Sequence, residues 1–186
     1  YGQKITQMNL GPDDLTAENV YGYPLCTVCG AVRSPYSSDI ELTKFSEHHE
    51  KSCGKKTERM VFTAQDLVDG ILCEGIGDMA TAQNLGEALI VGASRRLDME
   101  RGDLSILVTQ KSDQSVSLFL YDPMPGGSGL LQQIIDQWQL IVDTSIQSMQ
   151  SCDGQCEKSC YKCLRTYYNT YYHKLLDREI AATALQ

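Results

Sequence analysis

Cysteine is the residue type in this sequence best placed to do chemistry, and four of the eight cysteines lie within twelve residues. They are Cys152, Cys156, Cys160 and Cys163. Two disulfides need a defined separation and orientation of their partners, which four thiols this close together do not easily provide. One tetrahedral metal ion accepts four thiolates at such intervals. The pattern therefore predicts a structural zinc site.

A second group of metal-binding residue types lies nearer the start of the chain. Cys26 and Cys29 form a CxxC pair, and His49 and Cys53 follow after a polar stretch of about twenty residues, which is close to the spacing of zinc fingers. His49 and Cys53 are separated by three residues, so a helix would place both on one face. His48 is the alternative ligand. We expect a second zinc ion here.

Both predicted zinc sites are completed by protein ligands, with no position left for a water molecule or a substrate. Closed sites of this kind are structural, whereas a catalytic zinc keeps an open position. Cys73 stands alone in the sequence, and we expect it to behave as a small core residue. The predicted cofactor is therefore zinc, as two structural ions.

Composition limits the other functions. The chain has 186 residues, and 16 Lys and Arg against 24 Asp and Glu give a net charge of −8, the wrong sign for a protein that coats DNA by charge alone. No apolar stretch reaches the roughly 18 residues of a membrane span, and no secretory signal opens the chain. Unpaired thiols fit a reducing compartment, so we expect a cytoplasmic protein with no membrane contact.

The elements that must position these residues follow from hydrophobic periodicity. Apolar residues recur at helical intervals from 79 to 97, with Asp78 as the N-cap, and again in one long amphipathic helix from 131 to 149. Aliphatic runs at 104–108 and 116–121 predict two strands joined as a hairpin. These elements indicate an α+β fold, a small mixed sheet with packed helices, buttressed by two zinc knuckles.

Two segments are predicted. Residues 1–55 comprise an irregular lead-in and the Cys/His zinc finger, and residues 56–186 form a zinc-binding domain that carries the four-cysteine cluster.

A glycine-rich segment, PGGSG at 125–129, follows the second predicted strand. It lacks the Lys-Ser/Thr of a P-loop, so we interpret it as a tight turn. The alternative is a metal-dependent nuclease or phosphate-handling enzyme that uses this loop with Glu87, Asp103 and Asp122.

The C-terminal segment is rich in tyrosine and contains Arg165. Its tyrosines can stack on single-stranded bases, seal a partner interface, or pack over the zinc knuckle. A second short basic run contains Lys55, Lys56 and Arg59. If the chain contacts DNA, we expect these four basic residues and the tyrosine-rich tail to do so.

Three motifs resemble one known family. They are YDPMPGGSGL at 121–130, SCYKCLRTYYN at 159–169 and HKLLDR at 173–178, in this order and separated by a long predicted helix. Together they resemble the MrfA-like zinc-binding domain family, over about residues 79–186. The family is found at the C-terminal end of DEAD/DEAH-box DNA helicases implicated in repair, and in the DrmB component of the DISARM anti-phage system. The resemblance implies that the four clustered cysteines bind zinc.

The resemblance also implies a partner. This chain has no Walker A motif, so we expect the helicase or ATPase motor to lie elsewhere, in cis or in trans. The predicted function is a non-catalytic accessory domain of a DNA helicase or translocase system, in repair or anti-phage defence, which stabilises the motor, docks a partner or guides DNA. The alternatives are the enzyme described above and a pure protein-interaction module.

Overall fold

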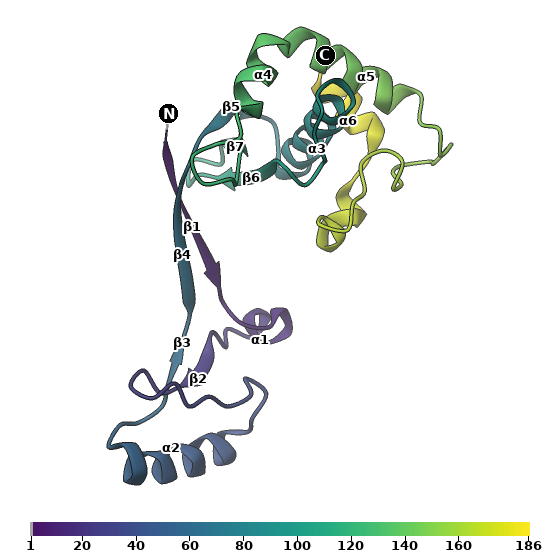
Figure 1. Cartoon of the computed structure of the whole chain (residues 1–186). Helices are drawn as coiled ribbons and strands as arrows, with labels where there is room; N and C mark the ends of the chain where they lie inside the picture. Colours follow the sequence, from purple (N-terminus) through teal and green to yellow (C-terminus); the bar gives the residue numbers. More distant parts are fainter. Residues whose placement is uncertain (1) are drawn as a thin grey trace. The chain divides into compact units, whose positions relative to one another are not determined.

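The computed structural model of the protein describes residues 2–186 (Figure 1). The elements of the first part of the chain are β1 (Gln3–Asn9), α1 (Asp13–Ala17), β2 (Tyr23–Leu25), α2 (Asp39–Cys53), β3 (Glu58–Met60) and β4 (Phe62–Val68). Those of the second part are β5 (Gly70–Ile76), α3 (Met79–Arg96), β6 (Ser105–Gln110), β7 (Val116–Tyr121), α4 (Leu130–Asp136), α5 (Trp138–Gln150), the 3₁₀ helix η1 (Thr170–Leu175) and α6 (Arg178–Ala184).

The chain divides into two compact units. The smaller unit comprises residues 4–66, and the larger comprises residues 67–186 with the short N-terminal segment that precedes residue 4. The predicted boundary, between residues 55 and 56, falls earlier than this division. The difference arises because β3 and β4 follow the predicted boundary but pair with earlier strands: β3 with β2, and β4 with β1.

Helix α3 is the centre of the larger unit. It packs against the sheet on one side and against α5 and α6 on others. Its side chains contribute to three apolar clusters: Ile90 packs with Leu120 of β7, Leu89 packs with Leu118 of β7, and Val91 packs with Met149 at the end of α5. The zinc-ligand candidates near the C-terminus are therefore attached to the best-buried helix of the fold.

The sheet of the larger unit has the strand order β5-β7-β6, and both neighbouring pairs are antiparallel. The predicted α+β class is confirmed, but the prediction of a mixed sheet is wrong. A tight hairpin joins β6 to β7, and the connection through α3 returns the chain so that β5 and β6 run in the same direction. Because β7 lies between them, no two neighbours in this sheet are parallel.

The predicted helix at 79–97 is confirmed, and its start has the expected cause. Asp78 accepts a hydrogen bond of 2.8 Å from the Thr81 N–H, so its side chain caps α3. The single long helix predicted at 131–149 is wrong, because the backbone at Gln137 (φ −115°, ψ 22°) separates α4 from α5. The apolar spacing continues across Gln137, so periodicity gives no signal for this break.

None of the helices in residues 2–186 is both long and apolar enough to cross a membrane.

The close packing of α3 against α5 yields a prediction at Gly92. A Cβ atom added there would lie 2.6 Å from the carbonyl oxygen of Ile141 and 2.0 Å from Ser145 Oγ, so the two helices would have to separate. Overpacking costs about 1–3 kcal/mol, and alanine in a helix interior returns about 1 kcal/mol, so we expect Gly92→Ala to destabilise the protein by a net amount of up to about 2 kcal/mol. Urea unfolding measures the difference.

The matched control is Gly77→Ala, because a Cβ atom at Gly77 meets no atom within 4 Å. A Gly92→Ala variant as stable as this control would contradict the close approach of α3 and α5.

Candidate metal centres

The four C-terminal cysteines converge on one point. The sulfur of Cys152 lies 3.6 Å from that of Cys160 and 3.7 Å from that of Cys156. The sulfur of Cys163 lies 3.6 Å from that of Cys156 and 3.8 Å from that of Cys160. A tetrahedral zinc ion with bonds of about 2.3 Å holds its sulfurs roughly 3.8 Å apart, whereas a disulfide joins them at about 2.0 Å. The cluster thus has the dimensions of a zinc site and not of two disulfides.

The backbone around this cluster passes close to the sulfurs and donates hydrogen bonds to them. The N–H of Cys160 donates to Cys163 Sγ at 3.1 Å, and the N–H of Gly154 donates to Cys152 Sγ at 3.4 Å. Hydrogen bonds of this kind stabilise thiolates, which are the form that binds metal. A Cβ atom at Gly154 would lie 2.6 Å from Cys160 Sγ, so the loop passes too close to the sulfurs for a larger residue.

Two arginines tie the cysteine loop to the helices. Arg178, the first residue of α6, donates from Nη1 to the carbonyl of Met149 at 2.9 Å and from Nε to the carbonyl of Cys156 at 3.1 Å. Arg101 donates from Nη2 to the carbonyl of Leu164 at 2.7 Å. Cys163 is itself fully buried against the core. The cluster therefore joins the end of α5 to α6 and α3.

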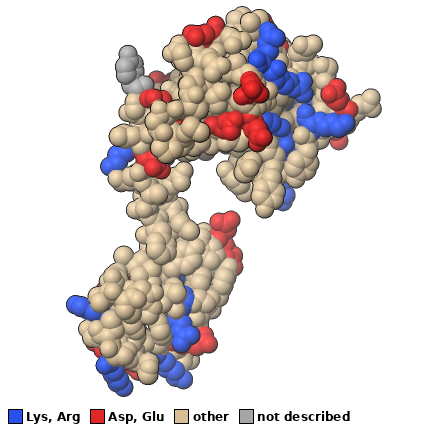
Figure 2. Space-filling view, in the orientation of Figure 1, with Lys and Arg blue, Asp and Glu red and all other residues tan. Residues whose placement is uncertain are grey.

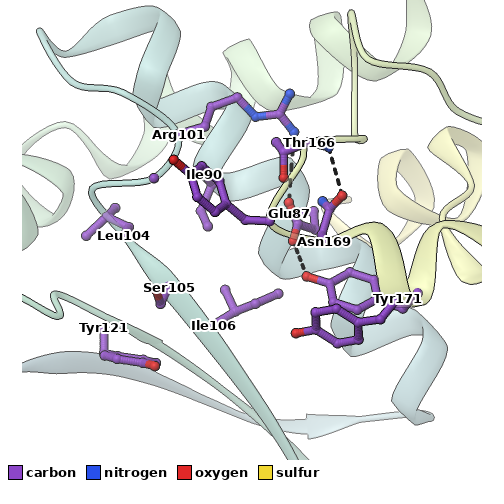
Figure 3. Close-up of a pocket in the computed structure, with 13 residues that line it drawn as sticks. Glu87, Ile90, Arg101, Leu104, Ser105, Ile106, Tyr121, Thr166, Asn169 and Tyr171 are labelled. Atoms are coloured by element: carbon purple, nitrogen blue, oxygen red, sulfur yellow. Dashed lines mark hydrogen bonds and ion pairs between the residues drawn. The ribbon is translucent and has the colours of Figure 1, made fainter. Parts of the chain in front are cut away.

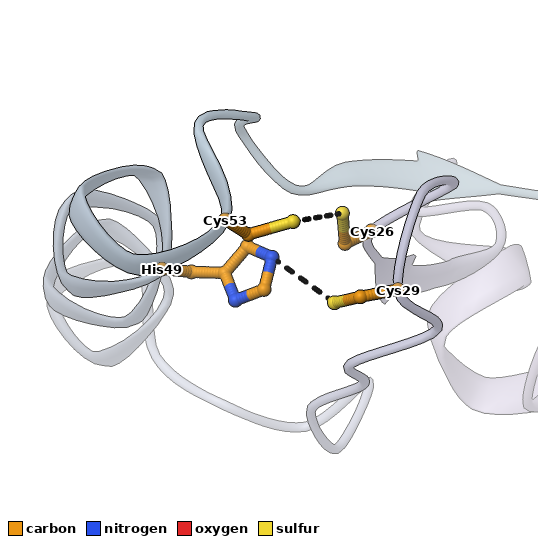
Figure 4. A group of neighbouring side chains, drawn as sticks. All are labelled: Cys26, Cys29, His49 and Cys53. Atoms are coloured by element: carbon orange, nitrogen blue, oxygen red, sulfur yellow. Dashed lines mark hydrogen bonds between the residues drawn. The ribbon is translucent and has the colours of Figure 1, made fainter.

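The first cluster lies in the smaller unit (Figure 4). Cys26 and Cys29 occupy the turn after β2, and His49 and Cys53 lie on one face of α2. Cys26 Sγ is 3.9 Å from Cys53 Sγ, and Cys29 Sγ is 3.4 Å from His49 Nε2. His49 is buried and its ring faces the sulfurs, whereas His48 is exposed and is not part of the group. The structure thus brings together all eight predicted metal ligands in two groups.

Local sequence explains how the first cluster forms. The Gly30 N–H donates to the carbonyl of Cys26 at 2.9 Å, and Gly30 has a φ of 74°, which favours glycine at this turn. Helix α2 begins at a capping box in which Ser38 and Glu41 bind each other's backbone N–H groups. These two features fix the turn and the helix that face each other across the site.

The thiol pKa values reflect the crowding of the sulfurs. Hydrogen bonds from the backbone of Cys29 lower the pKa of Cys26 to about 6. Burial and the neighbouring thiols raise the pKa of Cys53 to about 11 and that of Cys156 to about 12. Without a cation, the Cys53 and Cys156 thiols therefore resist ionisation at neutral pH. A divalent ion lowers the pKa values of these thiols, because it stabilises all the thiolates together.

The acidic residues of the alternative enzyme hypothesis each make hydrogen bonds with a different partner. Glu87 accepts a hydrogen bond from the Tyr172 hydroxyl, and Asp103 accepts one of 2.7 Å from the Glu100 N–H. Asp122 is buried and accepts from the hydroxyl and the N–H of Ser128, both at 2.5 Å. Across residues 2–186, these acids do not form a group close enough to share a metal ion.

The glycine-rich segment is a turn held by Asp122. Burial would raise the pKa of this carboxyl, but the hydrogen bonds from Ser128 and from the Met124 N–H outweigh burial and lower it. Gly126, Gly127 and Gly129 all have positive φ values. The carboxylate thus serves to close a sterically demanding turn.

The predicted DNA-contacting residues lie in both units. Lys55 and Lys56 are exposed, whereas Arg59 donates to the carbonyls of Gly22 and Pro35 at 3.1 and 3.2 Å. Arg165 Nε donates to the hydroxyl of Ser159 at 3.0 Å. On the face drawn in Figure 2, Lys and Arg side chains form a run across one side of the larger unit.

The tyrosines of the C-terminal segment do not all pack over the zinc knuckle. Tyr167, Tyr168 and Tyr171 are 83%, 76% and 83% exposed, while Tyr172 packs against the apolar cluster that contains Cys163. The C-terminal segment therefore has aromatic rings that are exposed to solvent.

Two buried asparagines have structural roles that were not predicted. Asn169 accepts from the Thr166 N–H at 2.7 Å and donates to the Leu164 carbonyl at 2.9 Å, so it organises the loop that carries the tyrosines. Asn84 of α3 donates to the Leu175 carbonyl at 2.9 Å. Asn84 is a polar residue within the apolar face of α3, and this pattern is the sequence signal that could have predicted its role.

The fold is α+β, and each of its two units carries one site of zinc dimensions. Residues 85–164 match the family model MZB, the MrfA Zn-binding domain. The predicted resemblance to this family is thereby confirmed, and zinc is the metal that its description gives.

Two further similarities were found. The chain is 31% identical to the Druantia protein DruE of Escherichia coli (strain UMEA 4076-1), over 216 aligned residues that cover 99% of this chain and 11% of that protein. The chain thus spans about a tenth of this relative's length. A crystal structure of the DUF1998 helicase MrfA bound to DNA aligns at 13% identity and a TM-score of 0.48, over 99% of this chain and 25% of that one.

The C-terminal cluster predicts the effect of removing one thiol. We expect Cys160→Ser to lower the zinc content from two ions to one per chain and to lower the melting temperature, because metal binding and folding are linked. Elemental analysis by mass spectrometry measures the zinc content. Cys73→Ser is the control, since Cys73 lies in β5 outside both clusters. A Cys160→Ser variant with two zinc ions and an unchanged melting temperature would overturn the assignment.

The adjacent histidines of α2 provide a second test. His49→Ala should remove one zinc ion, because its Nε2 faces the three sulfurs, whereas His48→Ala should retain both. The two variants remove the same side chain from neighbouring positions of one helix. Equal zinc contents in the two variants would refute the assignment of His49.

Proposed function

We propose that this chain is a non-catalytic accessory domain of a DNA helicase or translocase system, with the motor in cis or in trans. In this proposal, one zinc ion is held by Cys26, Cys29, His49 and Cys53, and the other by Cys152, Cys156, Cys160 and Cys163. The domain acts in the cytoplasm, in DNA repair or anti-phage defence. It guides DNA and stabilises the region of the motor to which it is attached.

The observation that carries this proposal is the closed four-sulfur cluster within the segment that matches a Zn-binding domain family. Its four sulfurs complete a tetrahedron, so the ion has no vacant position for a reacting water. What the ion can do is hold the loop at 151–165 against α3, α5 and α6. A rigid loop of this kind holds its exposed side chains at fixed positions, where they can contact DNA or the motor.

Local charge supports DNA contact despite the net charge of −8. Residues 158–176 contain no Asp or Glu, and they include Lys158, Lys162, Arg165 and Lys174. Lys162 and Lys174 are exposed, together with four tyrosines of the same segment. Lysines interleaved with exposed aromatic rings suit a single strand, because the lysines attract the phosphates and the rings stack on bases.

A second candidate function is protein docking by the outer face of the sheet. Leu72 of β5 and Leu107 of β6 both lie opposite Phe119 of β7, and the two leucines are 57% and 40% exposed. This apolar row lies on the face away from α3. A helicase motor that binds here would be captured equally well after nuclease treatment.

The DNA-guiding function predicts a salt-dependent affinity for single-stranded DNA, measured by fluorescence anisotropy with the zinc-loaded chain. The slope of log affinity against log salt is negative, and each lysine that contacts a phosphate of a single strand contributes about −0.7 to it. Changing both Lys162 and Lys174 to Ala should therefore make this slope less negative by about 1.4.

Lys111→Ala is the matched control, because this exposed lysine is already paired with Glu74 at 3.2 Å. The absence of any DNA binding at low salt would contradict the DNA-guiding role. Cleavage of DNA by the purified chain with Mg²⁺ or Mn²⁺ would contradict the non-catalytic role.

A further inference from the structure

A cavity of about 230 Å³ lies in the larger unit beside the tyrosine-rich segment (Figure 3). Its apolar base is formed by Ile90 of α3 with Leu104 and Ile106. Glu87 and Arg101 lie toward one end, and Tyr121 and Tyr171 come from different parts of the chain on other sides. Its volume is below the roughly 300–1,000 Å³ of pockets for drug-sized ligands, so it suits one small group.

Arg101 lies at the polar end of the cavity, and its guanidinium is held by the backbone of the cysteine loop. Nη2 donates to the Leu164 carbonyl at 2.7 Å, and Nη1 donates to the Arg165 carbonyl at 3.4 Å. Nη2 also lies 3.9 Å from Glu87 Oε2. Arg101 Nε has no hydrogen-bond partner among the described residues, but it has almost no accessible surface, so a ligand in the cavity does not reach it. Arg101 therefore contributes its ion pair to this end of the cavity and no free donor.

The cavity is also walled by aromatic rings. Tyr168 lies against Gly102, where an added Cβ atom would be 3.3 Å from its ring, and Tyr171 extends from η1. Both rings are mostly exposed, so they line the entrance without being needed in the core. Flat walls of this kind favour a flat ligand.

The charge of the cavity favours a neutral ligand over a phosphate. Glu87 and Arg101 form an ion pair within it, so their charges largely cancel. Tyr172 donates its hydroxyl hydrogen to Glu87 and is therefore neutral. A phosphate would meet the Glu87 carboxylate, which repels it, whereas a nucleobase is flat, neutral and rich in acceptors. Exposed Lys162 and Lys174 belong to the same acid-free segment, where a phosphate backbone can pass.

We infer that this cavity receives one unpaired base of single-stranded DNA, which stacks on Tyr168 and Tyr171. This inference rests on the proposed DNA-guiding function and adds to it the position and chemistry of the contact. The apolar residues at the base of the cavity and the Glu87–Arg101 ion pair complete the site around the stacked base. Stacking of a base on an aromatic ring accepts any sequence, because every base has a flat face.

The test measures the affinity of the zinc-loaded chain for a labelled single-stranded oligonucleotide by anisotropy. Tyr168→Ala and Tyr171→Ala should each weaken binding roughly 5- to 150-fold, the range of one base–aromatic stack. Tyr167→Ala is the matched control, because Tyr167 is equally exposed and adjacent in sequence but does not line the cavity. It should change the affinity less than twofold. Arg101 is unsuitable for substitution because it also holds the Leu164 carbonyl.

A second oligonucleotide without bases isolates the stacking contact. On this abasic strand, wild type and Tyr168→Ala should bind equally, because the group that Tyr168 contacts is missing. If the chain binds normal single strands but Tyr168→Ala binds them as tightly as wild type, the cavity inference is overturned and the DNA-guiding function stands. If the chain binds no DNA, both fail. An equal loss of affinity on normal and abasic strands would assign Tyr168 to the backbone and also overturn the inference.

Discussion

Mutual repulsion among crowded thiolates is the constraint on which the larger unit depends. Four sulfurs lie within 4.8 Å of one another at the end of α5, and two thiolates at about 4 Å repel by roughly 4 kcal/mol at an effective dielectric constant near 20. Within residues 2–186, no lysine or arginine nitrogen donates a hydrogen bond to these sulfurs. A divalent cation at the centre converts this repulsion into attraction, and its binding energy then becomes folding energy.

The consequences extend well beyond the cysteines. The segment between α5 and η1 has no helix or strand of its own, so its conformation depends on the metal cluster and on the side chains that clamp it. Arg178 and Arg101 bind its carbonyls, and Asn169 closes the following loop. That loop carries Tyr168 and leads to Tyr171. The zinc knuckle thus fixes the rings that line the cavity, although neither ring touches a sulfur.

Much of this arrangement follows from local sequence, and the exceptions share a cause. The cysteine spacings, the Asp78 cap and the β6–β7 hairpin are local signals, and each has its expected counterpart in the structure. The break at Gln137 was not predictable, because the apolar spacing continues through it. The antiparallel sheet was not predictable either, since strand order depends on which strand occupies the centre. The Arg101–Leu164 contact joins residues more than sixty positions apart, and no local pattern reports such a pairing.

We propose that seven cysteine sulfurs and one histidine nitrogen enclose two structural zinc ions. X-ray absorption at the zinc K-edge on the purified, zinc-loaded chain tests it most directly. We predict two zinc ions per chain that share seven sulfurs at about 2.3 Å and one nitrogen at about 2.0–2.1 Å, an average of about 3.5 sulfurs and 0.5 nitrogen per zinc, with no water oxygen. A first shell that contains oxygen, or one with markedly fewer sulfurs per zinc, would contradict closed structural sites.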